Sequence, residues 1–194
     1  AADTAGATPP IALRIVDAER KPVAGASVRV DPNAAEIEFL DLQDAEPLLA
    51  AVAPRTSDEY GLVYAQLPRG VAMATARKGD AYAQAWIDVA AALTDPVELQ
   101  VMPDRELVVH TQLPGGTAAP HVPVELAYSW DRNVAIKRLQ HHVLGRTDAN
   151  GELVVRHAQR LFRATPVAPN LLLRPLVGGA STAATAVSLN AART

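Results

Sequence analysis

The sequence of 194 residues contains no cysteine. This absence excludes disulfides, thiolate metal ligands and a cysteine nucleophile. Aromatic residues are also scarce, at 4% of the chain, although 49% of the residues are hydrophobic. A hydrophobic core is therefore expected to consist mainly of Val, Leu, Ile and Ala side chains.

Long apolar runs and an excess of positive charge are missing as well. No run approaches the roughly 18 apolar residues that cross a bilayer, so no transmembrane segment is predicted. The net charge of −3 gives no electrostatic reason to expect a nucleic-acid partner. Residues 1–10 are small and polar and end in Pro-Pro, which is typical of a flexible mature N-terminus or a linker. This predicts an extracytoplasmic protein of bacterial type, in the periplasm, at the cell surface or secreted.

The dominant pattern that is present is an internal repeat. Residues 13–30 (LRIVDAERKPVAGASVRV) have a counterpart in residues 107–126 (LVVHTQLPGGTAAPHVPVEL). Two further matches follow in the same order, residues 55–61 with 146–151 and residues 86–94 with 186–194. Three ordered matches indicate a tandem duplication. We expect a flexible segment at 1–10, one module at 11–103 and a second at 104–194.

Within each copy, apolar residues alternate with polar ones over short runs bounded by Pro, Gly, Asp and Asn. This period of two predicts strands with one buried face, and many such strands favour an antiparallel β-sandwich. The fold class expected is all-β, with two sandwich modules of prealbumin-like or Ig-like type. Asp44 as an N-cap predicts a short helix in the insert of the first module. The second insert, residues 129–145, is more polar and gives no clear pattern.

The last strand predicted for the first copy, residues 97–101 (VELQV), has no counterpart in the second copy. Two explanations stay open. The strand belongs to a longer polypeptide, or another subunit supplies it by strand addition at the second module.

Several motifs resemble those of carboxypeptidase-regulatory-like and Cna-B-like modules. They are PVAGA at residues 22–26, TSDEYG at 56–61 and LPRG at 67–70. The second copy keeps Thr147, Asp148 and Gly151 but loses the LPRG motif. The resemblance implies a prealbumin-like sandwich. Such modules serve as spacers, adhesin stalks, pilin domains or appendages to enzymes.

The sequence does not match the residue pattern of any catalytic, cross-linking or metal-binding site that was considered, so no catalytic, cofactor-binding or metal-binding residue is predicted. The Cna-B-like cross-link needs a Lys on the first strand, and Lys21 lies in a turn. Intradiol dioxygenases bind iron through Tyr and His, but adjacent His141 and His142 would point to opposite faces of a strand. Asp148 and Asn150 fit a turn better than a calcium loop. The chain is not expected to be an enzyme.

Five residues are candidates for partner binding: Tyr82, Trp86, Trp130, Arg132 and His141. Tyr82 and Trp86 share the predicted outward face of an Ala-rich strand, where exposure of aromatic rings is costly. They either pack on the first insert or between modules, or they form a partner-binding patch.

The function expected is that of a non-catalytic structural or adhesive protein, a surface, pilus or fibre component that acts through protein–protein contacts or self-association. The alternative is a carbohydrate- or protein-binding accessory region of a larger secreted hydrolase or transport assembly.

Overall fold

The computed structural model describes residues 10–31, 44–89, 95–113, 115–128, 140–163, 172–177, 180–181 and 185–186. The chain divides into two compact units, Ala1–Asp104 (unit 1) and Arg105–Thr194 (unit 2). Antiparallel sheets dominate both units, which confirms the predicted all-β fold class. In the described part of the chain, no helix is long and apolar enough to cross a membrane.

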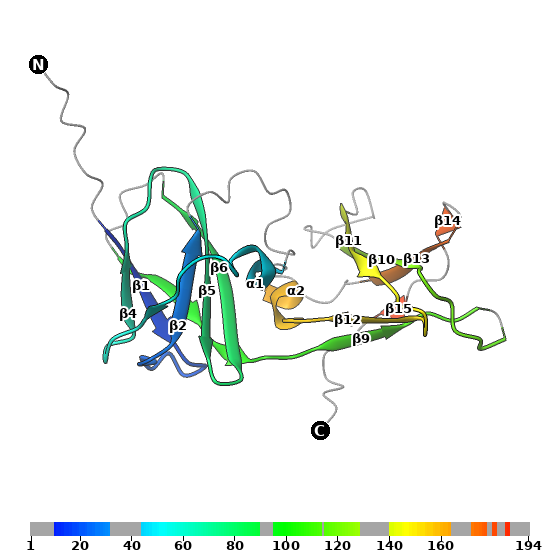
Figure 1. Cartoon of the computed structure of the whole chain (residues 1–194), viewed down its shortest axis with the longest axis horizontal. Helices are drawn as coiled ribbons and strands as arrows, with labels where there is room; N and C mark the ends of the chain where they lie inside the picture. Colours follow the sequence, from blue (N-terminus) through cyan, green and yellow to red (C-terminus); the bar gives the residue numbers. More distant parts are fainter. Residues whose placement is uncertain are drawn as a thin grey trace, which may run out of the picture. The chain divides into compact units, whose positions relative to one another are not determined.

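Unit 1 is a sandwich of two sheets (Figure 1). In the three-stranded sheet, β1 (Ile11–Val16) pairs antiparallel with β4 (Leu62–Ala65) and parallel with β7 (Val97–Gln100). The order in the five-stranded sheet is β3 (Arg55–Thr56), β2 (Ser27–Asp31), β5 (Val71–Lys78), β6 (Ala81–Asp88) and β8 (Met102–Pro103). The C-terminal segment of unit 1 therefore contributes β7 to one sheet and β8 to the other.

The core of unit 1 lies between these sheets because one alternating row of each strand points inward. Leu13 and Ile15 of β1 are fully buried, and Leu99 of β7 is 1% exposed. The facing strands supply mainly small residues, among them Ala74 and Ala76. Burying each large aliphatic side chain contributes about 2 kcal/mol.

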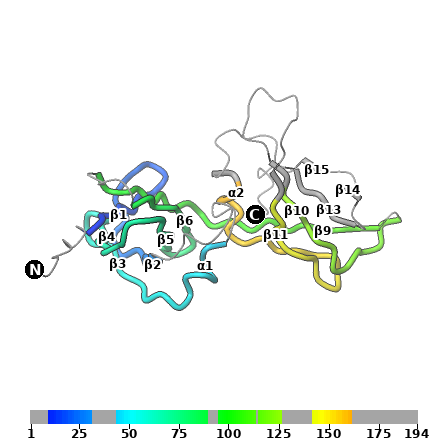
Figure 2. Tube along the Cα trace, turned by 90° about the horizontal axis from the view of Figure 1, so that it is seen from above, coloured from blue at the N-terminus to red at the C-terminus, as the bar shows by residue number. Residues whose placement is uncertain are grey.

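The predicted helix is present as α1 (Ala45–Leu48), and its N-cap is Asp44. The Asp44 carboxylate accepts a hydrogen bond from the Glu46 backbone N–H at 3.1 Å, which satisfies one of the free donors of the first turn. Ala45 packs with Leu49 and with Met73 of β5, in a cluster separate from the main core. Figures 1 and 2 show α1 beside β5.

Unit 2 also contains two sheets. One is formed by β9 (Leu107–His110) and β12 (Glu152–Val155), which are antiparallel. In the other, β10 (Pro123–Tyr128) lies between β11 (Gln140–Arg146) and β13 (Leu172–Val177). Two short strands, β14 (Ala180–Ser181) and β15 (Thr185–Ala186), also pair with β13. A helix that the sequence did not predict, α2 (Gln159–Arg163), follows β12.

The strand register corrects the sequence match at the first strand. Leu13 lies opposite Val63 in unit 1, and Val109 lies opposite Leu153 in unit 2, so the structural counterpart of Leu13 is Val109 and not Leu107, with which the sequence match begins. At the start of the third sequence match, Trp86 pairs with β5 and Ala186 pairs with β13, and residues 90–94 and 187–194 of this match lie outside the described residues. The helix α2 stands where the LPRG motif follows β4 in unit 1, so the loss of that motif coincides with a change of local structure.

Two findings refine the expected organisation. Pro103, the last residue expected in the first module, belongs to β8 and lies opposite Ala81 of β6. The second insert, expected at 129–145, is partly regular, because β11 begins at Gln140. Residues 1–9, most of the proposed flexible start, lie outside the described residues.

Candidate functional site

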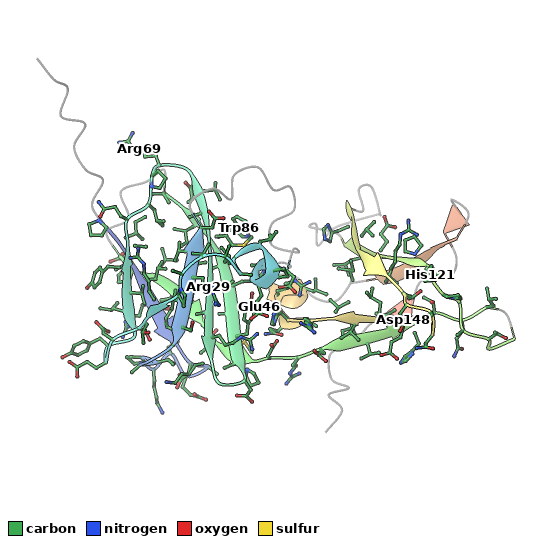
Figure 3. All side chains as sticks on the ribbon, viewed as in Figure 1. Arg29, Glu46, Arg69, Trp86, His121 and Asp148 are labelled. Carbon is green, nitrogen blue, oxygen red and sulfur yellow. The ribbon has the colours of Figure 1, made fainter. Side chains whose placement is uncertain are left out.

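The two aromatic residues of β6 pack within unit 1. Tyr82 is only 2% exposed, and its hydroxyl donates to Gln84 Oε1 at 3.1 Å. The guanidinium carbon of Arg77 lies 5.4 Å from the centre of the Tyr82 ring, within the range of a cation–π contact. Trp86 packs against the cluster of Ala45, Leu49 and Met73, beside α1 in Figure 3. Trp86 therefore packs on the insert, and a role for Tyr82 and Trp86 in partner binding stays a prediction.

A small charged cluster borders these aromatics. Arg77 forms ion pairs with Glu46 of α1 at 2.9 Å and with Asp104 at 3.5 Å. Both acidic partners and Arg77 itself remain partly accessible to solvent. Half-exposed pairs of this kind contribute at most about 1 kcal/mol each. Their effect here is to tie the insert to β5 and to the end of unit 1.

The other three partner-binding candidates come from the second insert. Trp130 and Arg132 lie outside the described residues. His141 lies in β11, opposite Ala127 of β10, and His142 lies opposite Leu126. A role for Trp130, Arg132 and His141 in partner binding stays a prediction.

The remaining histidines occupy unrelated positions in unit 2. His110 lies at the end of β9, with Nδ1 3.7 Å from the Glu152 carboxylate. His157 is buried at 2% exposure and has a positive φ of 51°. His142 is half-buried, and burial, with the nearby Arg160 charge, lowers its pKa. The described residues contain no cluster of three or more His, Asp or Glu that could hold a metal ion.

The strongest common feature of the two units is a buried side-chain hydroxyl at corresponding positions. In unit 1, Ser57 accepts from the Ala26 N–H at 2.9 Å and donates to the Val23 carbonyl at 2.8 Å. In unit 2, Thr147 accepts from the Val122 N–H at 3.0 Å and donates to the Ala119 carbonyl at 3.1 Å.

Ser57 and Thr147 are 4% and 2% exposed, respectively. An unpaired buried polar group costs about 1 to 3 kcal/mol, so these bonds are structurally important.

The acidic turns that follow these hydroxyls are equally well matched. Asp58 Oδ1 accepts from the N–H groups of Tyr60 and Leu62 at 2.9 and 2.8 Å. In unit 2, Asp148 Oδ1 accepts from the backbones of Asn150 and Glu152 at 2.8 and 2.9 Å. These backbone hydrogen bonds, from Glu152 and then Asn150, lower the pKa of Asp148. Asp148 serves its own turn, near His121 in Figure 3.

Each turn closes with a glycine in the left-handed region. Gly61 has a φ of 73°, and a Cβ there would lie 2.5 Å from the Ile15 carbonyl oxygen. Gly151 has a φ of 74°, and a Cβ would lie 2.7 Å from the Thr111 carbonyl oxygen. Both positions therefore exclude any side chain. We refer to the buried hydroxyl, the Asp turn and this glycine together as the repeated frame.

The two units differ in the cover of their first strand. The inward residues Ile11 and Leu13 of β1 are 7% and 0% exposed. Their counterparts in β9, Leu107 and Val109, are only half-buried. The sequence repeat could have located this row, but only the structure reveals its exposure.

Comparison with known proteins gives limited information. No protein-family model and no curated protein matches the chain. A Bacillus anthracis TIE protein is 15% identical with a TM-score of 0.34, over 76% of this chain and 26% of that one. A streptococcal ancillary pilin is 11% identical with a TM-score of 0.35, over 97% of this chain and 61% of that one. At such low TM-scores, neither structure identifies a family or a function for this chain.

Proposed function

We propose that this chain is a non-catalytic, extracytoplasmic structural or adhesive protein, a component of a surface, pilus or fibre that works through protein–protein contacts. The observation that carries the proposal is the repeated frame. The duplication retains a hydroxyl, a carboxylate and a glycine, and each of them serves the backbone of its own unit.

A duplicated reactive site would retain polar groups that face solvent or a pocket. The Ser57 hydroxyl instead holds the turn to the connection between β1 and β2, and the Thr147 hydroxyl holds its turn to the connection between β9 and β10. The repeated frame therefore recurs as a structural element that stabilises each unit. Repetition of a scaffold suits a protein that positions contact surfaces along a chain.

The carboxypeptidase-regulatory-like and Cna-B-like resemblance agrees with this proposal, and it remains a resemblance of motifs. Both implied families include spacers and adhesin stalks. The proposal does not rest on these motifs alone, because it also uses the hydrogen bonds of the repeated frame in this chain.

Location and contact can be tested together in the cells that make the protein. Intact cells would be treated with protease and, separately, with a membrane-impermeant cross-linker. We expect the polypeptide to be cleaved from outside and to be cross-linked into species of higher mass, while a cytoplasmic marker remains intact. Recovery of the polypeptide only from the cytoplasmic fraction, protected from both reagents, would refute the proposal.

A further inference from the structure

The half-buried row of β9 has a complete counterpart in unit 1. There, β7 lies parallel to β1, with Leu13 opposite Val97 and Ile15 opposite Leu99. The inward residues Leu99 and Val101 are 1% and 5% exposed and join the core. The strand that completes this edge in unit 1 thus supplies part of the cover of Leu13.

Hydrogen bonds show which backbone N–H groups of β7 point toward β1. The N–H of Val101 donates to the Val16 carbonyl at 2.8 Å, which continues the β1–β7 ladder. Alternate residues of a strand direct their N–H groups to the same side. Leu99, two residues before Val101, therefore also directs its N–H toward β1, whereas Gln100 directs its N–H away.

The same reasoning applies to β9. Thr111, just after β9, donates its N–H to the Gly151 carbonyl at 2.8 Å, on the β12 side. Val109 therefore faces β12 with its backbone groups, while Val108 and His110 direct theirs to the opposite edge. In the described part of unit 2, the only strand paired with β9 is β12.

We propose that this edge of β9 accepts a β-strand from another polypeptide chain, in the parallel direction and register in which β7 pairs with β1. This inference rests on the proposed function, because it names the kind of protein contact involved. The occupant is an extended segment with apolar side chains at alternate positions, as in VELQV, which would cover Leu107 and Val109. Two later strands of the described part of unit 2, β14 and β15, pair with β13 in the other sheet. We assign the occupant to another chain in keeping with the proposed function.

The outer face of the two strands provides further contact area for such a partner. Val108 is 38% exposed and Val154 is 43% exposed, and they lie opposite each other. In unit 1 the corresponding pair is Ala12 and Tyr64. An added strand would therefore have apolar neighbours beyond the inward row.

The chain itself contains a suitable probe. A fluorescent peptide with the sequence of residues 95–104, DPVELQVMPD, would be titrated into the full chain and followed by anisotropy. We expect saturable binding that weakens at least about tenfold when the peptide nitrogen corresponding to Leu99 is methylated, the loss expected for one hydrogen bond. The matched control is methylation at the nitrogen corresponding to Gln100, which faces away and should leave binding unchanged.

Two variants test the protein side of the contact. Val109→Glu places a charge in the inward row and is expected to weaken peptide binding at least about tenfold. Val143→Glu places the same charge on β11 of the other sheet, where Val143 is 52% exposed, and should leave peptide binding unchanged. Circular dichroism would verify that both variants are folded, and the methylated peptides test the unmodified chain in any case.

Several results would overturn the inference. One is a lack of saturable binding up to about 1 mM peptide. Another is equal binding of the two methylated peptides, which would mean that the peptide does not add as a strand. If peptide binding fails while the protein is still cross-linked at the cell surface, only this inference falls. If the peptide binds but the protein proves to be cytoplasmic, the proposed function falls.

Discussion

The first strand of each unit has matching hydrogen bonds on one side, from Ile15 to Gly61 and from Thr111 to Gly151, yet its inward side chains have different environments. Leu13 of β1 is fully buried between β4 and β7, whereas Val109 of β9 is half-buried beside β12. The repeated frame joins segments 34 and 28 residues apart, through the hydrogen bonds from Ser57 to Val23 and from Thr147 to Ala119. Core burial depends in addition on a strand from much later in the chain. Two copies of a duplicated module can therefore keep the same turns and differ in how completely their inward side chains are buried.

The largest effect is expected where the two units are most alike. Gly61→Ala should destabilise unit 1 by about 4 kcal/mol, because the Cβ would lie 2.5 Å from the Ile15 carbonyl oxygen at a φ of 73°. Gly151→Ala should have a similar effect on unit 2. The control is Gly79→Ala, whose φ is 58° but whose Cβ would have no neighbour within 4 Å. Urea unfolding measures all three, and a Gly61→Ala effect no larger than that of the control would contradict the shared role of these glycines.

The next prediction concerns the feature in which the units differ. Leu13→Ala should cost about 3 kcal/mol, as is typical of a fully buried Leu. Leu107→Ala lies on the inward row of β9, which is half-buried, and should cost only about 1 kcal/mol. Denaturant midpoints of the two variants provide the comparison. Equal losses would mean that the two inward rows are equally covered.

A smaller effect is expected at one turn position that the duplication did not conserve. Gly25 has a φ of 68°, and its counterpart His121 has a φ of 57° without the conformational freedom of glycine. His121→Gly should stabilise unit 2 by about 0.5 kcal/mol, since relief of strain exceeds the entropy gained by the unfolded chain. Gly25→His should destabilise unit 1. Thermal unfolding of both variants would test this, and a destabilised His121→Gly variant would contradict it.

The smallest effect is a pH dependence in unit 2. Backbone hydrogen bonds lower the pKa of Asp148 in the folded state, so its carboxylate favours folding above the ordinary pKa. This contribution is lost as the pH falls from about 4 through the lowered folded-state pKa. Asp148→Asn should therefore make unit 2 less sensitive to acid in that range. Urea midpoints from pH 2 to 6 would show this, and an unchanged pH profile would contradict it.

Much of this architecture could be predicted from the sequence because its signals are local. Alternation predicted β1 and β2, Asp44 predicted the start of α1, and the repeat predicted matching turns. Each of these depends on residues close together in the chain.

Other features could not be predicted because they depend on contacts between distant segments. Alternation placed Tyr82 on an outward face, and α1 and Arg77 then enclosed that face. The helix α2 has only five residues and no acidic residue in its first turn, so its sequence signal is weak. The half-buried state of Leu107 is a property of its sheet and has no signal in the sequence of β9.

The account depends most directly on the difference between two strand edges. β1 pairs with β7 along one edge, whereas no strand in the described part of unit 2 pairs with the matching edge of β9, called here the open edge. Hydrogen exchange of the full chain, read at the backbone amides of Arg14 and His110, measures this difference at matched positions. Arg14 faces β7 and is predicted to exchange slowly, whereas His110 faces the open edge and is predicted to exchange at nearly the rate of an unprotected amide. Equal, strong protection of both amides would contradict the account.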